Sequence, residues 1–230
     1  MHSNKLIMNS LLSNLKIAVP EKIYVKDPES SALGKRIIEH SIVLINDIGF
    51  DAFTFKKLGI LIGSNESSIY RYFESKHKLL LYLSSWYWAW IEYQLVFETH
   101  SLNPSDKLVK AIEIVTRTIK EDSNFSHINE VLLNRIMVNE NSKSFLTKEV
   151  DKENKDGYFV VYKSIVRRLR DMIKTIKPDY KFPSSLATTI LEGSLHQHFL
   201  KDHFLSITDC SNELSPTDFM KNLVLNTLKS

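Results

Sequence analysis

The stretch from Thr54 to Phe73, TFKKLGILIGSNESSIYRYF, most constrains what this chain can fold into. Its apolar residues Phe55, Leu58 and Ile62 recur at helical spacing, so they share one face of a first short helix. Gly63 follows this helix at a point where a left-handed backbone commonly ends one. The pattern predicts that a tight turn begins at this glycine.

A second short helix is predicted directly after the turn. Ser64 or Asn65 can cap its start, and Ile69 and Phe73 lie four residues apart on its buried side. Its other faces carry small polar, aromatic and basic side chains, which are Ser67, Ser68, Tyr70, Arg71 and Tyr72. Two helices joined by a glycine-containing turn, with such an outer surface, are typical of a DNA-reading helix-turn-helix.

The segment resembles the N-terminal DNA-binding domain of the TetR family of bacterial transcriptional regulators. That family's pattern has a Thr that opens the first helix, an Ile/Leu-Ala pair, a Gly and a polar cap. A Leu/Ile-Tyr-x-Tyr/His-Phe box and a Ser-Lys-x-x-Leu helix start follow. The matching residues here are Thr54, Leu58-Gly59, Gly63, Asn65, Ile69 to Phe73 and Ser75 to Leu79. The resemblance covers roughly residues 33 to 80, and beyond it only length and helical character agree.

The resemblance implies a set of DNA contacts from residues 54–73 and their flanks. Phosphate contacts are expected from Thr54, Tyr70 and Lys76, and Lys35 and Lys56 lie near helix starts where they can also reach phosphate. Groove contacts are expected from Asn65, Ser67, Ser68 and Arg71, whereas Tyr72 is either a base contact or a packing residue. A bidentate bond from Arg71 to guanine would contribute about 1–3 kcal/mol of base discrimination.

Two residues depart from the family pattern. Gly59 replaces the usual Ala, which costs up to about 1 kcal/mol of helix stability. Glu66 places a carboxylate at the start of the second helix, where it interacts favourably with the helix dipole but is repelled by DNA phosphates. Alternatively, this carboxylate accepts a hydrogen bond from cytosine N4. These departures leave open an alternative, a helical small-molecule-binding or protein-interaction module that no longer reads DNA.

Composition narrows the class of protein further. The chain has 230 residues with only six Gly and six Pro, which favours long helices, and its net charge of +3 permits nucleic acid without requiring it. The single Cys210 excludes a disulfide framework and fits a cytoplasmic protein. No apolar run is long enough for a membrane span, and no enzyme signature or cofactor motif is present.

Periodicity along the whole chain predicts an all-α fold. We expect an N-terminal extension at 1–29, a three-helix DNA-binding domain at 30–80 and a C-terminal helical effector-binding and dimerisation domain at 81–230. The first helix should run from Ser30 or Ser31 to about Asp47, with a buried stripe of Leu33, Ile37, Leu44 and Ile48. Later helices are expected near 76–99, 104–121, 128–139, 144–176, 184–205 and 217–228.

The N-terminal extension admits two interpretations. A short amphipathic helix is predicted from Lys5 to Ile17, and Pro20 ends it before an extended segment. The favoured interpretation is a strap packed on the protein's own helices. The alternative is a basic arm that reaches a DNA groove, although its lysines are widely dispersed.

The C-terminal part contains residues suited to a ligand, a partner subunit or a metal. An aromatic lining for a hydrophobic or aromatic effector is predicted from Trp90, Tyr93, Phe97, Tyr162 and His196. The last two helices are expected to form a homodimer interface through Leu191, Leu195, Phe199, Phe219 and Leu223. Glu192, His196 and His203 share helical spacing, but without a second ligand cluster we expect no metal site. The run Arg167, Arg168, Arg170 and Lys174 is expected to be a solvated face, with anionic-ligand contact as the alternative.

Together these features predict a homodimeric transcriptional regulator, more specifically a repressor. It would bind a near-palindromic DNA operator and be released by a small-molecule effector.

Overall fold

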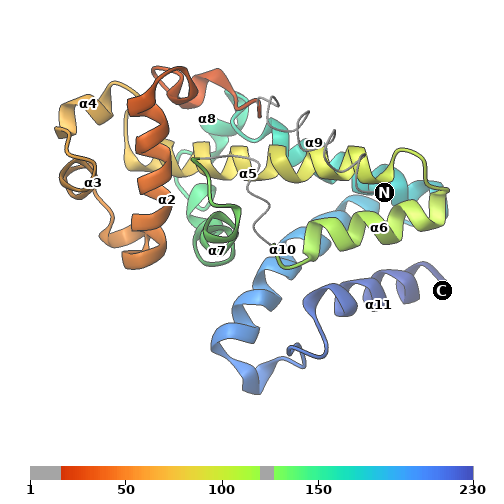
Figure 1. The fold of residues 1–230 in the computed structure, drawn as a ribbon. Helices are drawn as coiled ribbons and strands as arrows, with labels where there is room; N and C mark the ends of the chain where they lie inside the picture. Colours follow the sequence, from red (N-terminus) through yellow and green to blue (C-terminus); the bar gives the residue numbers. More distant parts are fainter. Residues whose placement is uncertain (1–16, 120–126, 230) are drawn as a thin grey trace, which may run out of the picture. The chain divides into compact units, whose positions relative to one another are not determined.

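The computed structural model describes residues 17–119 and 127–229 (Figure 1). Within these ranges the secondary structure is helical, with no strand. The chain divides into two compact units, Met1–Tyr87 with Ile119–Tyr158, and Trp88–Thr118 with Phe159–Ser230. The first unit therefore joins the predicted 30–80 segment to a later part of the chain, whereas the sequence suggested a boundary near residue 80.

The first unit begins with two 3-10 turns, η1 (Glu21–Ile23) and η2 (Pro28–Ser30), and helix α2 (Ala32–Ala52). Ser31 caps α2 by accepting a hydrogen bond from the Gly34 amide at 3.1 Å. Gly49 breaks the helix with a φ of 75°, close to the predicted end. The predicted buried stripe is partly wrong, because Ile48 is 38% exposed. The buried face is made instead by Ile37, Ile38, Ile42 and Ile45.

The helix-turn-helix follows as α3 (Phe55–Leu61) and α4 (Glu66–Tyr70), which lie beside α2 in Figure 1. Helix α5 (Lys76–Thr99) comes next and has the predicted bounds. Its aromatic stretch is buried as expected for packing residues, with Trp86 in the first unit and Trp88 and Trp90 in the second all below 5% exposed.

The remaining helices of the first unit are α7 (Glu130–Glu140), η3 (Asn141–Ser144) and α8 (Val150–Lys155), with α7 packed on α2. The predicted continuous helix from 144 to 176 is wrong. Gly157 takes a φ of 90°, a left-handed conformation that ends the helical path, and α9 (Val160–Ile176) starts afresh after it.

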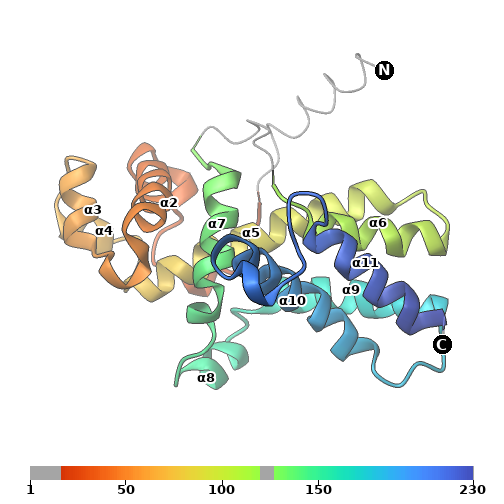
Figure 2. The ribbon, with the colours of Figure 1, turned by 90° about the horizontal axis from the view of Figure 1, so that it is seen from below.

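The second unit contains the C-terminal half of α5 together with α6 (Pro104–Thr116), α9, α10 (Pro183–His203), η4 (Leu205–Ile207) and α11 (Pro216–Lys229) (Figure 2). Helices α6, α9 and α11 each pack against α10. A buried hydrogen bond from the Thr116 hydroxyl to the Thr217 hydroxyl, 3.0 Å long, joins α6 to α11. No helix in the described ranges is both long and apolar enough to span a bilayer.

Candidate nucleic-acid interface

The turn between α3 and α4 is held by side-chain caps on both helices. The Thr54 hydroxyl accepts from the Lys57 amide at 3.2 Å, and Asn65 Oδ1 accepts from the Ser68 amide at 2.8 Å. Gly63 has a φ of 60°, as the sequence predicted. Gly59 has a role that the sequence did not reveal, because a Cβ there would lie 2.9 Å from the Ser64 carbonyl oxygen. The close approach of the turn thus explains the glycine at this position.

The inner faces of the two helices form the predicted core. Phe55, Leu58, Ile62, Ile69 and Phe73 are all buried. Phe55 also meets the ring of Tyr70 edge-on, with centroids 5.0 Å apart, so Tyr70 is held while remaining 48% exposed. The hydrophobic contacts fix the orientation of α4 relative to α3.

The outer face of α4 separates side chains that hold the helix from side chains that point to solvent. Asn65 Oδ1 accepts from both the backbone amide and the hydroxyl of Ser68, each at 2.8 Å, so these two groups are engaged in the cap. Ser67, Tyr70 and Arg71 are exposed, and Glu66 is partly exposed in the first turn. The exposed hydrogen-bonding side chains that take no part in this cap are therefore Ser67, Tyr70 and Arg71.

Tyr72 is a packing residue in this structure. The sequence left open whether it packs or contacts a base. Its side chain is 4% exposed, and its hydroxyl lies 2.8 Å from the Ser31 hydroxyl. The hydrogen bond with Ser31 lowers the pKa of Tyr72, and Lys26 and Arg71 add to this effect while burial opposes it. The phenol is therefore held by the Ser31 hydroxyl, with the ammonium of Lys26 over its ring.

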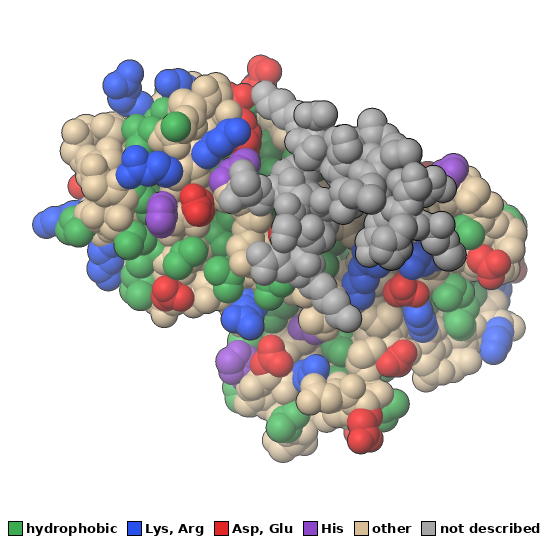
Figure 3. Space-filling model, in the orientation of Figure 1, with side chains coloured by type: hydrophobic (Ala, Val, Ile, Leu, Met, Phe, Trp, Pro, Cys, Tyr) green, Lys and Arg blue, Asp and Glu red, His purple; other side chains and the backbone are tan. Residues whose placement is uncertain are grey.

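The basic side chains of this unit fall into two groups. Lys76 donates to the carbonyl oxygens of Phe50, Asp51 and Phe53 at 3.0, 3.0 and 3.2 Å, which uses all three ammonium donors at the end of α2. A phosphate contact by Lys76 would require one of these bonds to open. Lys35 and Lys56, by contrast, are exposed. Lys and Arg side chains gather over the surface of α2, α3 and α4 in Figure 3.

The five predicted effector-pocket residues do not line the cavity of about 560 Å³ that lies between α5, α6 and α9. Trp90 is buried, Tyr93 stacks on Phe97 at 6.2 Å, and Tyr162 donates a 2.6 Å hydrogen bond to Glu192. His196 is exposed. The aromatic residues are engaged in helix packing, so the lining of a cavity could not be read from their composition.

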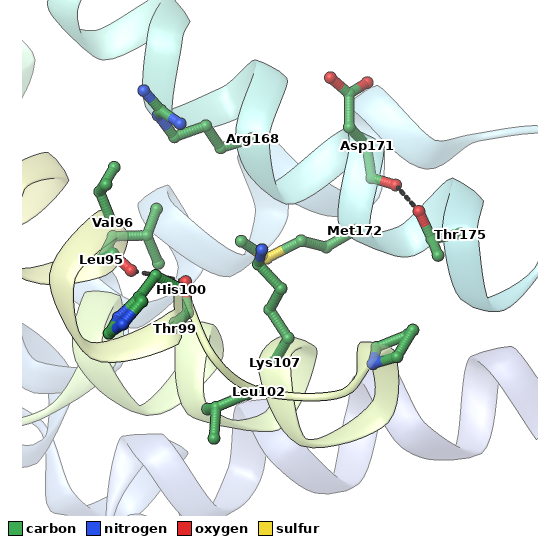
Figure 4. A pocket seen from close by; sticks show the side chains of 11 residues that line it. Leu95, Val96, Thr99, His100, Leu102, Lys107, Arg168, Asp171, Met172 and Thr175 are labelled. Carbon is green, nitrogen blue, oxygen red and sulfur yellow. Dashed lines mark hydrogen bonds between the residues drawn. The ribbon is translucent and has the colours of Figure 1, made fainter.

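A cavity of about 560 Å³ lies between α5, α6 and α9 (Figure 4). Its apolar lining includes Leu95, Val96, Leu102 and Met172, and its charged lining consists of Lys107, Arg168 and Asp171 with His100 nearby. The Arg168 Nε atom donates to Glu92 at 2.6 Å, and Asp171 is bound by Arg170 at 2.7 Å. Lys107 has no ion-pair partner among the described residues, and it reaches toward Met172 in Figure 4.

The predicted dimer-interface residues separate into two classes. Leu191 and Leu195 are buried inside the second unit, so they fill its own core and offer no surface to another copy, which corrects the prediction for these two residues. Phe199 and Leu223 are half-buried, and Phe219 is 43% exposed. The sequence analysis missed an exposed apolar group between α10 and α11, which comprises Phe204, Leu205, Ile207 and Leu214.

The histidines of α10 have other partners in this structure. His196 and His203 both approach the ring of Phe199, at 6.4 and 4.7 Å, while Glu192 is bound by Tyr162. In the described part of the chain, no group of three or more His, Cys, Asp or Glu residues is placed to hold a metal ion. His198 instead bonds the Thr116 carbonyl at 2.8 Å.

This geometry defines a class of protein, an all-α helix-turn-helix DNA-binding protein. Residues 37–83 match the family model described as bacterial regulatory proteins, tetR family. The chain therefore contains, in residues 37–83, the DNA-binding domain of tetR-family bacterial regulatory proteins.

Solved structures share the fold over most of the chain. AibR in complex with isovaleryl coenzyme A and operator DNA is 18% identical with a TM-score of 0.55, covering 82% of this chain and 97% of AibR. A putative transcriptional regulator from Saccharomonospora viridis in complex with choline is 18% identical with a TM-score of 0.56, covering 86% and 97%. The superpositions show a common fold at low sequence identity. A comparison with curated proteins gave no significant match.

Proposed function

We propose that this protein binds an operator as a homodimer in the cytoplasm, represses transcription and is released from DNA by a small-molecule effector. The observation that carries this proposal is the outer face of α4, where Ser67 and Arg71 are exposed on a helix that is fixed by its own caps and core. The AibR complex, which contains both operator DNA and an acyl-coenzyme A, supports a ligand-responsive regulator.

The exposed side chains suggest how the contacts divide between bases and backbone. Arg71 can donate two bonds to guanine O6 and N7, and Ser67 can donate to or accept from a base edge. Four exposed side chains of this unit carry a hydroxyl or an ammonium and are suited to phosphate, which are Tyr70, Thr54, Lys56 and Lys35. Asn65 and Ser68 hold the start of α4, so we expect them to act mainly through its position.

Fluorescence anisotropy with the duplex upstream of the protein's own gene tests direct reading. Arg71→Ala should weaken binding by about 5- to 150-fold per half-site, which corresponds to about 1–3 kcal/mol. Arg167→Ala, which removes an exposed arginine from α9 in the second unit, should leave affinity unchanged. If the wild-type protein does not bind the duplex at low salt, or if Arg71→Ala binds as tightly as wild type, the proposal that Arg71 contacts a base is refuted.

We infer that the cavity between α5, α6 and α9 holds the effector. Its apolar lining suits a hydrocarbon body, as the sequence suggested, and the ammonium of Lys107 adds a preference for an anionic group. Hexanoate should raise the melting temperature of the protein more than hexanamide does. Lys107→Gln should remove the difference, while Lys174→Gln, on the exposed surface of α9, should preserve it. Equal responses to the two compounds would contradict the anionic preference.

The exposed apolar group between α10 and α11 supports a dimer through this end of the second unit. Phe219 lies on α11 beside Leu214 and Ile207, which line a cavity of about 490 Å³ with it. Sedimentation at micromolar concentration should show a dimer, and Phe219→Asp should shift it to monomer. Leu146→Asp, at an apolar residue that is 75% exposed in the first unit, is the matched control. A wild-type monomer would refute the interface.

A further inference from the structure

The N-terminal strap, residues 17–31, is fixed beside the end of the recognition helix α4. The Val25 amide donates to the Tyr72 carbonyl oxygen at 2.8 Å, and the ring of Tyr24 meets Tyr82 edge-on at 6.1 Å. Ile23 is 1% exposed. These contacts hold the backbone of the strap just before Lys26, and Ser31, which caps α2, holds it a few residues after Lys26.

Lys26 is the exposed cation at this position. Its ammonium lies 5.1 Å from the centroid of the Tyr72 ring, and the Tyr72 hydroxyl is 2.8 Å from that of Ser31. Tyr72 directly follows Arg71, the exposed arginine of the recognition helix. An ammonium and two hydroxyls thus gather next to the residue that is best placed to read a base. The exposed ammonium of Lys26 is the group here that is suited to a phosphate oxygen.

Two acidic side chains near Lys26, Asp27 and Glu29, have hydrogen-bond partners of their own. Glu29 Oε1 lies 2.8 Å from His127 Nε2 and accepts from the Tyr82 hydroxyl at 3.4 Å. Asp27 Oδ1 accepts from the Glu29 amide at 2.9 Å, which caps η2. No ion pair neutralises Lys26 among the described residues, whereas the neighbouring Lys22 pairs with Asp156 at 3.8 Å. The ammonium of Lys26 is therefore available for a contact outside the chain, next to the carboxylate of Asp27.

We propose that Lys26, held over the ring of the buried Tyr72, binds a phosphate of duplex DNA next to the base contacts of α4. The strap is then part of the DNA interface, although it lies outside the helix-turn-helix. This inference rests on the proposed function, since it assumes that α4 enters a DNA groove. It assigns Lys26 a backbone contact and no role in base selection, because an ammonium reads a phosphate as a point charge.

The salt dependence of DNA binding separates this role from a structural one. Anisotropy titrations of Lys26→Gln against the upstream duplex and against an unrelated duplex should both show weaker binding. The slope of log affinity against log salt should become shallower by about 1 per half-site, or roughly 2 for a dimer. The ratio of the two affinities should stay as in wild type, whereas Arg71→Ala should reduce it.

Two variants provide matched controls. Lys26→Arg should restore the wild-type slope, because it retains the positive charge, and Lys22→Gln should leave the slope unchanged, because that lysine already has a carboxylate partner. A wild-type slope for Lys26→Gln overturns the inference while the proposed function stands. A change in slope equal to that of Lys22→Gln also overturns it. If the wild-type protein binds neither duplex at low salt, the proposed function fails and this inference fails with it.

Discussion

Glu140 connects α7 to the segment that leads into the helix-turn-helix. Its side chain is 11% exposed, and Oε1 accepts a hydrogen bond from the Phe50 amide at 3.0 Å. The Lys143 ammonium lies 2.8 Å from Oε2 of Glu140 and 2.7 Å from Asp51. The carboxylate therefore satisfies a buried amide directly after the break in α2 at Gly49.

Replacing Glu140 by Ala should destabilise the protein mainly through that amide. A buried donor left without an acceptor costs about 1–3 kcal/mol, and the ion pair with the half-exposed Lys143 contributes at most about 1 kcal/mol more. A loss of about 2–3 kcal/mol corresponds to a fall of roughly 5–10 °C in melting temperature for a chain of this size. Glu140→Gln retains an acceptor for Phe50, so it should cost only about 1 kcal/mol.

Thermal and urea unfolding of the two variants measure these differences. Glu149→Ala, which removes an exposed carboxylate that makes no cap hydrogen bond to α8, should remain within about 0.5 kcal/mol of wild type. The reasoning is refuted if Glu140→Gln is as unstable as Glu140→Ala, because the charge and not the Phe50 bond would then be responsible. It is also refuted if Glu140→Ala behaves like Glu149→Ala.

Three further predictions concern stability. Gly49→Ala should lower the free energy of unfolding by about 1–3 kcal/mol, measured in urea, because Gly49 combines a φ of 75° with a ψ of 158° that only glycine adopts readily. Gly63→Ala should lower it by less, and equal losses for the two variants would contradict this reason. Lys76→Met should cost about 1–3 kcal/mol by removing three bonds to carbonyl oxygens, measured against Lys56→Met, which should be nearly neutral. Burial lowers the pKa of His198 below its usual 6.5, so the unfolded chain takes up its proton first as pH falls. The free energy of unfolding should therefore fall as pH is lowered through about 6.5, and His198→Asn should reduce this dependence; an unaltered pH profile would refute it.

The sequence predicted the helix-turn-helix well because the information there is local. Caps, turn glycines and apolar spacing within residues 54–73 decide the backbone path, and the core face of Phe55, Leu58, Ile62, Ile69 and Phe73 is confirmed. The bounds of α5 were also correct.

Features that depend on packing between distant segments were harder to predict. Apolar residues at helical spacing can face the protein's own core or a partner, and periodicity cannot separate these cases for Leu191 and Leu195. The helix predicted over 144–176 is divided at Gly157, a residue at which a kink was expected; the apolar pattern alone does not show that its left-handed backbone ends the helical path. The residues predicted for the effector differ from those that line the cavity. Trp90 is buried in packing, whereas the cavity is lined by residues such as Leu95, Lys107 and Met172.

The caps of the recognition helix have a consequence for how operator preference can change. Asn65 and Ser68 bond to each other and to the backbone, whereas Ser67 and Arg71 are exposed and take no part in that cap. Substitutions at Ser67 or Arg71 therefore alter the surface presented to a base while the folded shape persists. Exposed substitutions of this kind change the free energy of unfolding little. The protein can therefore evolve to recognise a different operator sequence without first evolving greater stability.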